Sequence, residues 1–146
     1  MGQMPQFVSN QLPVLINKGD MDGAIKILKT FIDSIPYDIR LNFESYYRTT
    51  IDFVFAIHGI NCRSDVHIAV GRIDMLVETN TAIYCFEFKL GKTAQEALEE
   101  IDRKEYLLPW TMSGKKLYKV GVIFDHATRN IGDWKIAQYI WQRKGD

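Results

Sequence analysis

Two neighbouring strand-like segments constrain the fold of this chain more than any other feature. Residues 72–78 and 83–90 are rich in apolar and β-branched side chains, and a connection of four residues separates them. If the two middle residues of that connection form the tip of a hairpin, the numbers of paired residues sum to 161 and Asp74 faces Glu87. Lys89 lies two residues beyond Glu87, so it shares the same face of the sheet. The spacing therefore predicts two carboxylates and one ammonium group close together, provided that the register does not slip by one residue.

The other face of this hairpin is expected to be apolar. Its expected side chains are those of Ile73, Met75, Tyr84, Phe86 and Phe88. Hydrophobic periodicity predicts helices over residues 12–16, 22–32 and 42–58, and a fourth that begins at Thr93 and stops before Pro109. Further strands are expected over residues 62–70, 117–124 and 134–141. We favour a strand over a helix for the last segment, because residues 125–132 look like a loop between two paired strands.

The segment 42–58 has the clearest helical pattern. Asn42 is the expected N-cap, and Glu44 lies in the first turn. The expected apolar stripe consists of Phe43, Tyr47, Thr50, Val54 and Ile57.

Length and composition limit the class of protein. The 146 residues fit one domain, expected over residues 12–146, with residues 1–11 as a disordered tail or one added during cloning. Lys and Arg number 18 and Asp and Glu number 18, which argues against a strongly basic nucleic-acid binder but not against a local site. The apolar runs are too short to span a membrane. Two cysteines are too few for a disulfide framework, and no export signal opens the chain, so a cytoplasmic location is expected.

The predicted charge cluster suits metal-dependent chemistry. Two carboxylates held close together repel each other unless a cation lies between them, and Mg²⁺ prefers oxygen ligands. Lys89 could then position a water molecule or stabilise negative charge on a phosphate. The simpler alternative is a solvated strand face on which Asp74, Glu87 and Lys89 form a cross-strand charge pair. Nucleotide binding is not expected, because Phe86 stands in mid-strand where a P-loop would need its first glycine.

Several short segments together resemble the PD-(D/E)XK nuclease superfamily. Asp74 matches the first acidic residue of the family signature, and Glu87 and Lys89 match its E-x-K. Other segments are similar to one subgroup, a nuclease-like module that follows an ATPase-like domain in uncharacterised bacterial proteins. These segments are Ile35-Pro36-Tyr37, Glu44 with Tyr46-Tyr47, Gly71 to Asp74, Phe86 to Lys89, Ala97-Leu98, Ile101, Lys104, Tyr106, Phe124 and Arg129 to Ile131.

The resemblance implies a fold and a set of site residues. The fold would be α/β (α+β) and restriction-endonuclease-like, a central mixed sheet of four to five strands flanked by helices, here with an N-terminal helical extension. Metal ligands would be Glu44, Asp74, Glu87 and the backbone carbonyl of Phe88, and the catalytic residues would be Asp74, Glu87 and Lys89. Arg72, Glu100, Lys104 and Tyr106 would contact substrate or support the ligands. Glu100 stands where the family often has glutamine. The implied cofactor is Mg²⁺, with Mn²⁺ as a substitute.

Simpler roles exist for several of these residues. Glu44 could complement the helix N-terminus or pair with Arg48, and Glu100 could pair with Lys104. Two functions therefore stay open. The first is a Mg²⁺-dependent nuclease acting on DNA, or less favourably on RNA. The second is a catalytically silent nuclease-fold module that serves in protein or nucleic-acid interaction or in regulation.

The expected partners follow from the same resemblance. The expected partner is nucleic acid, most favourably DNA, and no membrane is expected. An ATPase-like domain is a further partner if the chain belongs to a longer protein, and a homodimer stays open. Residues 89–119 contain seven Lys or Arg against five acids, which predicts modest, salt-sensitive affinity for nucleic acid.

Overall fold

The predicted hairpin is the centre of a mixed five-stranded sheet in the computed structural model, which describes residues 6–141. The strands are β1 (Asn61–Ile68), β2 (Gly71–Glu78), β3 (Ala82–Leu90), β4 (Lys116–Asp125) and β5 (Asn130–Gln138). They lie in sequence order, and only the β3–β4 pair is parallel. Within the described range, the helices are α1 (Gln6–Asn17), α2 (Met21–Asp33), α3 (Glu44–Ile57) and α4 (Ala94–Arg103), with short 3-10 turns at Tyr37–Ile39 and Leu108–Trp110.

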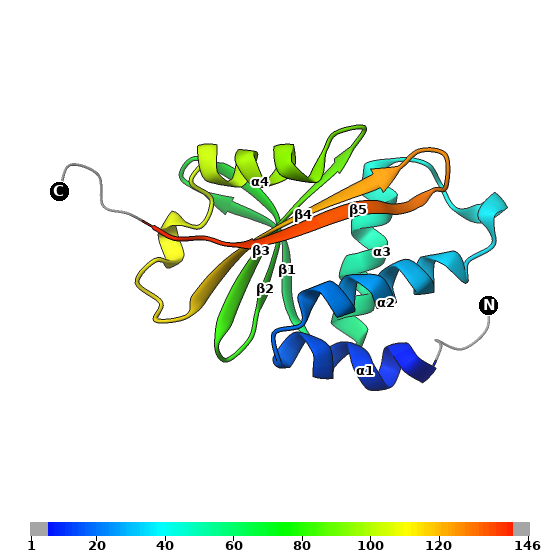
Figure 1. Ribbon diagram of the computed structural model, residues 1–146, viewed down its shortest axis with the longest axis horizontal. Helices are drawn as coiled ribbons and strands as arrows, with labels where there is room; N and C mark the ends of the chain where they lie inside the picture. The colour runs from blue at the N-terminus through cyan, green and yellow to red at the C-terminus, as the bar shows by residue number, and fades with distance from the viewer. Residues whose placement is uncertain (1–5, 142–146) are drawn as a thin grey trace.

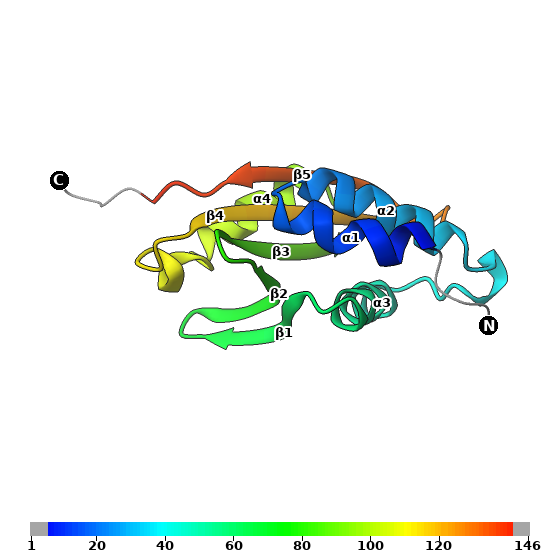
Figure 2. The same cartoon turned by 90° about the horizontal axis from the view of Figure 1, so that it is seen from below.

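Helices cover both faces of the sheet (Figure 1). Helix α4 connects the parallel strands β3 and β4 and packs on β3, β4 and β5. Helices α1, α2 and α3 lie on the other face, where α2 contacts β5 and α3 contacts β1 and β3 (Figure 2). The expected mixed sheet, its flanking helices and the N-terminal helical extension are therefore confirmed.

The register of the central hairpin is also confirmed. Strands β2 and β3 pair from Glu78 opposite Ile83 to Met75 opposite Phe86, so every paired sum is 161. The paired ladder ends there, and beyond it β2 runs with β1 away from β3 (Figure 2). Asp74 and Glu87 are the next residues after the last pair. Their side chains thus lie where the two strands begin to separate.

The divergence of β2 explains one wrong prediction. Ile73 does not join the cluster of Met75 and Phe86 on the face of helices α1–α3. It is fully buried in the cluster beneath α4, with Leu76 and Cys85. Alternation requires a regular pleat, and it fails where β2 leaves the plane of the sheet.

Three helix predictions need correction. Helix α1 begins at Gln6 rather than at residue 12, and residues 1–5 of the expected tail lie outside the described residues. Phe43 occupies the N-cap position of α3, because the side chain of Asn42 contacts His126 instead. Both Phe43 and Ile57 are about half exposed, at 49% and 50%. The buried face of α3 consists of Tyr47, Ile51, Val54 and Phe55.

The remaining elements agree more closely with expectation. The Thr93 side chain accepts a hydrogen bond from the Glu96 N–H at 3.1 Å, as the capping pattern predicts. Helix α4 ends at Arg103, and Glu105 follows in a left-handed conformation with φ of 51°. The last strand begins at Asn130, earlier than predicted, so the helical alternative is wrong there. Among the described residues, no helix has the length and apolarity that crossing a membrane requires.

Candidate metal-dependent active site

The side chains expected at the site converge on one open cleft of about 440 Å³. The cleft lies where β2 and β3 separate, between the first turn of α3 and the second half of α4. The predicted residues that line it are Glu44, Arg72, Asp74, Glu87, Phe88, Lys89, Glu100, Lys104 and Tyr106. Three further residues, Ser45, Arg48 and Gly71, complete the lining.

Asp74 is held by contacts to both of its carboxylate oxygens. Its Oδ2 accepts a hydrogen bond from the backbone N–H of Phe88 at 2.9 Å. Its Oδ1 accepts one from Nη1 of Arg48 at 3.0 Å. The side chain is 14% exposed, so the ion pair with Arg48 is largely shielded from solvent. The backbone contact substitutes for the strand pairing that is lost at this point.

Glu87 is the most deeply buried acid of the cleft, at 3% exposure. Burial raises the pKa of its carboxyl far above the ordinary value, and the neighbouring carboxyls of Glu100 and Asp74 raise it further. The nearest cation is Lys89, whose Nζ lies 3.6 Å from Oε2 of Glu87. Glu87 is therefore an acid whose charged form is poorly compensated by the surrounding side chains.

Lys89 is paired more closely with Glu100 than with Glu87. Its Nζ donates a hydrogen bond to Oε1 of Glu100 at 2.8 Å. Burial acts to lower the pKa of Lys89, but the contacts with Glu100 and Glu87 outweigh it and the pKa is raised. The pKa of Glu100 is lowered by its hydrogen bond with Glu87 and then by Lys89. Lys89 is thus held as an ammonium ion between two carboxyls, and the expected pairing of Glu100 with Lys104 is replaced.

Glu44 belongs to the same electrostatic cluster. It is half-buried in the first turn of α3, and burial followed by the charge of Asp74 raises its pKa. The charges of Arg48 and Lys89 act in the opposite direction. Arg48, the expected i+4 partner of Glu44, instead contacts Asp74.

The mouth of the cleft carries two exposed basic side chains and one buried aromatic ring. Arg72 is 54% exposed, and its Nε lies 3.6 Å from Oδ1 of Asp65. Lys104, the residue after α4, is exposed and also lines the cleft. Tyr106 is buried, and burial followed by the charge of Glu87 raises its pKa to about 12. Tyr106 therefore stays a neutral phenol over the physiological pH range.

The oxygen donors of the cleft fit a hard divalent cation. Carboxylates of Glu44, Asp74 and Glu87 are the ligand type that Mg²⁺ and Mn²⁺ prefer. Burial and then the neighbouring carboxyls raise the pKa of Glu87, so a cation bound here would stabilise its charged form. Within residues 6–141, however, no three His, Cys, Asp or Glu side chains are arranged as a ready metal site. Arg48 and Lys89 occupy positions beside the carboxylates instead.

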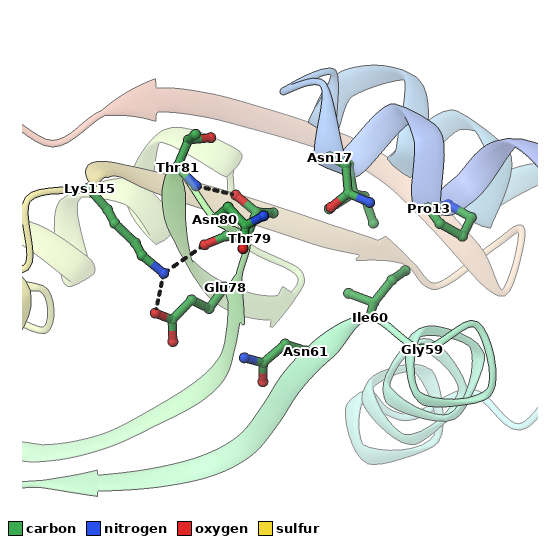
Figure 3. A pocket seen from close by; sticks show the side chains of 11 residues that line it. Pro13, Asn17, Gly59, Ile60, Asn61, Glu78, Thr79, Asn80, Thr81 and Lys115 are labelled. Atoms are coloured by element: carbon green, nitrogen blue, oxygen red, sulfur yellow. Dashed lines mark hydrogen bonds and ion pairs between the residues drawn. The ribbon is translucent and has the colours of Figure 1, made fainter.

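A larger hollow of about 640 Å³ lies at the other end of the hairpin, near the C-terminal ends of α1 and α3 (Figure 3). Its ammonium group, Lys115 Nζ, is bound to Oε2 of Glu78 at 2.6 Å and to the Thr79 carbonyl at 2.8 Å. The other lining side chains are mainly amides, hydroxyls and small apolar groups. Because its one ammonium group is already bound to a carboxylate and a carbonyl, we favour the smaller cleft as the candidate site.

Comparisons with known proteins matched a family model and a curated relative. A family model described as the PD-(D/E)XK nuclease superfamily matches residues 42–134, a range that contains every residue named for the cleft. A curated relative from Azotobacter chroococcum mcd 1, named "Uncharacterized protein in vnfD 5'region", is 31% identical over 130 residues. The match covers 84% of this chain and 25% of that relative, so the chain spans about a quarter of the relative's length. No solved structure matches the chain.

Proposed function

The chain belongs to the PD-(D/E)XK nuclease superfamily, and on that premise we propose that it is a Mg²⁺-dependent nuclease that hydrolyses phosphodiester bonds of DNA, with RNA as the less favoured substrate. Members of this superfamily generally use divalent metals. The observation that carries the proposal is the convergence of Asp74, Glu87 and Lys89 on one open cleft. A purely structural charge pair of Asp74, Glu87 and Lys89 would not require two further acids beside it, yet Glu44 and Glu100 are part of the same cluster.

The proposed roles follow from the contacts. Glu44, Asp74, Glu87 and the Phe88 carbonyl would hold Mg²⁺, or Mn²⁺ in its place, which when bound supplies polarisation of the phosphate and a more acidic water. The Lys89 ammonium group orients the attacking water and stabilises negative charge that develops on phosphorus-bound oxygens.

The residues around this centre have supporting roles in the proposal. Glu100 keeps Lys89 protonated and in place through the 2.8 Å hydrogen bond. Arg72 and Lys104 are exposed at the mouth, where they can contact backbone phosphates. The neutral Tyr106 forms part of the wall.

The longer biological context is also a proposal. We propose that the chain works in the cytoplasm as part of a longer protein that carries an ATPase-like domain. The share of the curated relative that it covers, 25%, supports a longer parent.

A second candidate function is a silent nuclease-fold module that binds a protein or a nucleic acid. Two observations favour it: Glu100 stands where the family often has glutamine, and Arg48 and Lys89 already form ion pairs with Asp74 and Glu100. In that case the cluster would be structural, and removal of Lys89 would leave binding of a partner unchanged.

The deciding experiment is a cleavage assay on single-stranded, duplex and branched DNA with Mg²⁺ or Mn²⁺. We expect the parent to cleave at least one substrate, and Asp74→Ala and Lys89→Ala to lose cleavage by a factor on the order of 10² or more. Lys92→Ala is the matched control, since Lys92 is exposed just past β3 and does not line the cleft. Equal cleavage by all four proteins would indicate a contaminating nuclease and would refute the proposal, as would absence of cleavage in the parent.

A further inference from the structure

Arg48 occupies a position that the sequence did not predict. It lies one turn after Glu44 on α3, and its side chain is 25% exposed. Its Nη1 is 3.0 Å from Oδ1 of Asp74 and 3.8 Å from Oδ1 of Asp65. The other oxygen of Asp74 accepts the N–H of Phe88. Asp74 can therefore present its Oδ1 fully to a metal only if Arg48 moves.

Asp65 provides a second acceptor for the same guanidinium. Asp65 lies between the pairs Ser64–Met75 and Val66–Ile73 of β1 and β2, on the part of β1 that runs beside Asp74. Asp65 has a left-handed backbone with φ of 52°, which is uncommon for a residue with a side chain. Its carboxylate is 49% exposed and forms ion pairs with Arg48 and Arg72, at 3.8 Å and 3.6 Å. The Asp65 carboxylate is thus more exposed than that of Asp74, and its ion pairs are longer.

There is also room for the movement. A small hollow of about 100 Å³ lies next to the main cleft, and both Arg48 and Asp74 border the two spaces. Asp65 lines this small hollow but not the main cleft. A shift of the guanidinium toward Asp65 would therefore carry it away from the carboxylates of Glu44 and Glu87.

We infer that Arg48 is a positioning residue that holds Asp74 while the cleft is metal-free and transfers to Asp65 when a divalent cation binds. The inference rests on the metal site of the proposed function. A divalent cation repels the guanidinium, and Asp65 offers it a replacement ion pair, so the carboxylate of Asp74 is released at small cost. If the ion pair between Arg48 and Asp74 did not move, Asp65 would have no effect on metal binding that depends on Arg48.

The test is a double-mutant cycle on Mn²⁺ affinity, measured by calorimetry and by the electron paramagnetic resonance signal of free Mn²⁺. The four proteins are the parent, Asp65→Asn, Arg48→Met and the double variant. We expect Asp65→Asn to weaken Mn²⁺ binding roughly tenfold when Arg48 is present, and to change it less than about twofold in the Arg48→Met background. We expect Arg48→Met alone to bind Mn²⁺ at least as tightly as the parent.

Three outcomes would overturn the inference. The first is an equal loss on Asp65→Asn in both backgrounds, which means that Asp65 acts only through its charge. The second is a loss of Mn²⁺ binding in folded Arg48→Met, which means that Arg48 has a structural role. The third is no Mn²⁺ binding by any of the four proteins. If Arg48→Met does not fold, Arg48→Lys replaces it; a lysine reaches only one acceptor, so its Asp65→Asn penalty should fall below half that of the parent.

The outcome is independent of the cleavage assay. A coupled cycle without DNA cleavage would support the Arg48 transfer and refute the nuclease proposal. DNA cleavage with an additive cycle would refute the transfer and leave the nuclease proposal intact. Asp102→Asn is the control for loss of one acid, because Asp102 pairs with Lys119 outside the cleft.

Discussion

Glu87 is the residue whose burial conflicts most strongly with its charge. Its pKa is raised from 4.5 by burial and then by the carboxyls of Glu100 and Asp74. An acid with a raised pKa in the folded state favours the neutral form there. Its contribution to stability is complete below the unfolded pKa and is lost as the pH rises above 4.5 toward the folded pKa. The metal-free protein should therefore become less stable as the pH increases over this range.

The first prediction is that Glu87→Gln stabilises the metal-free protein. The amide keeps the shape of the side chain and removes the buried charge, so we expect a gain of about 1–2 kcal/mol at pH 8 and a smaller one at pH 5. Urea unfolding in the presence of a chelator at the two pH values measures this. Glu99→Gln, on the exposed side of α4, is the control and should change stability little. A loss of stability at both pH values would show that the Glu87 charge is a structural partner of Lys89.

The second prediction concerns the proton on Lys89. Glu100 raises the pKa of Lys89 through the 2.8 Å hydrogen bond, so Glu100→Gln should lower that pKa, because a neutral acceptor replaces a charged one. The neutral amine of Lys89 would then be more abundant at pH 9 than in the parent. Competitive acetylation followed by mass spectrometry measures it, with Lys92 as the internal reference. Unchanged relative labelling would mean that Glu100 does not control the protonation of Lys89.

At the scale of elements, short-range patterns predicted the hairpin and α4 well. The β2–β3 register depends on one short connection, and the Thr93 cap depends on a residue three positions away. Both are determined within a single stretch of chain. That is why the juxtaposition of Asp74, Glu87 and Lys89 could be predicted before any tertiary information.

Contacts between distant elements could not be predicted in the same way. Ile73 changes face because β2 leaves β3 to follow β1, and this divergence depends on packing across the whole sheet. Arg48 was expected to pair with Glu44 one turn away, but its partner Asp74 is 26 residues away in sequence. The packing of α3 beside the sheet determines the contact between Arg48 and Asp74, and the spacing of residues along the helix cannot predict it.

The third prediction tests the docking of α4, which carries Glu100. Gly121 on β4 lies under the helix, and an added Cβ would be 2.7 Å from the Ala94 carbonyl oxygen and 2.9 Å from Cβ of Ala97. Gly121→Ala should therefore displace α4 and lower the free energy of unfolding by about 1–3 kcal/mol. Urea unfolding measures the loss. Adding Ala97→Gly, which removes one of the two close contacts, should recover only part of it. An unchanged stability would show that α4 shifts without cost.

At the scale of the whole molecule, the 18 basic and 18 acidic residues balance in number, and several of them also form ion pairs in the fold. Four of the seven Lys and Arg residues over residues 89–119 form ion pairs with acids. These pairs are Lys89–Glu100, Arg103–Glu100, Lys115–Glu78 and Lys119–Asp102. Arg72 and Lys104 are the basic residues that are exposed at the cleft itself. A nucleic acid approaching this cleft would thus meet few cations from this chain.

The fourth prediction follows from this shortage of cations. The isolated chain, with Ca²⁺ in place of Mg²⁺ to limit cleavage, should bind duplex DNA weakly, with a slope of log affinity against log salt near −2. Fluorescence anisotropy at several salt concentrations measures the slope. Arg72→Ala and Lys104→Ala should each reduce its magnitude by about 1, because each removes one phosphate contact. Lys116→Ala, at the start of β4 near the tip of the hairpin, should leave it unchanged. A steep slope that neither cleft variant alters would place the DNA on another surface of the chain. A shallow slope that both alter would mean that the cleft guides DNA but does not hold it, so tight binding would have to come from other parts of a longer protein.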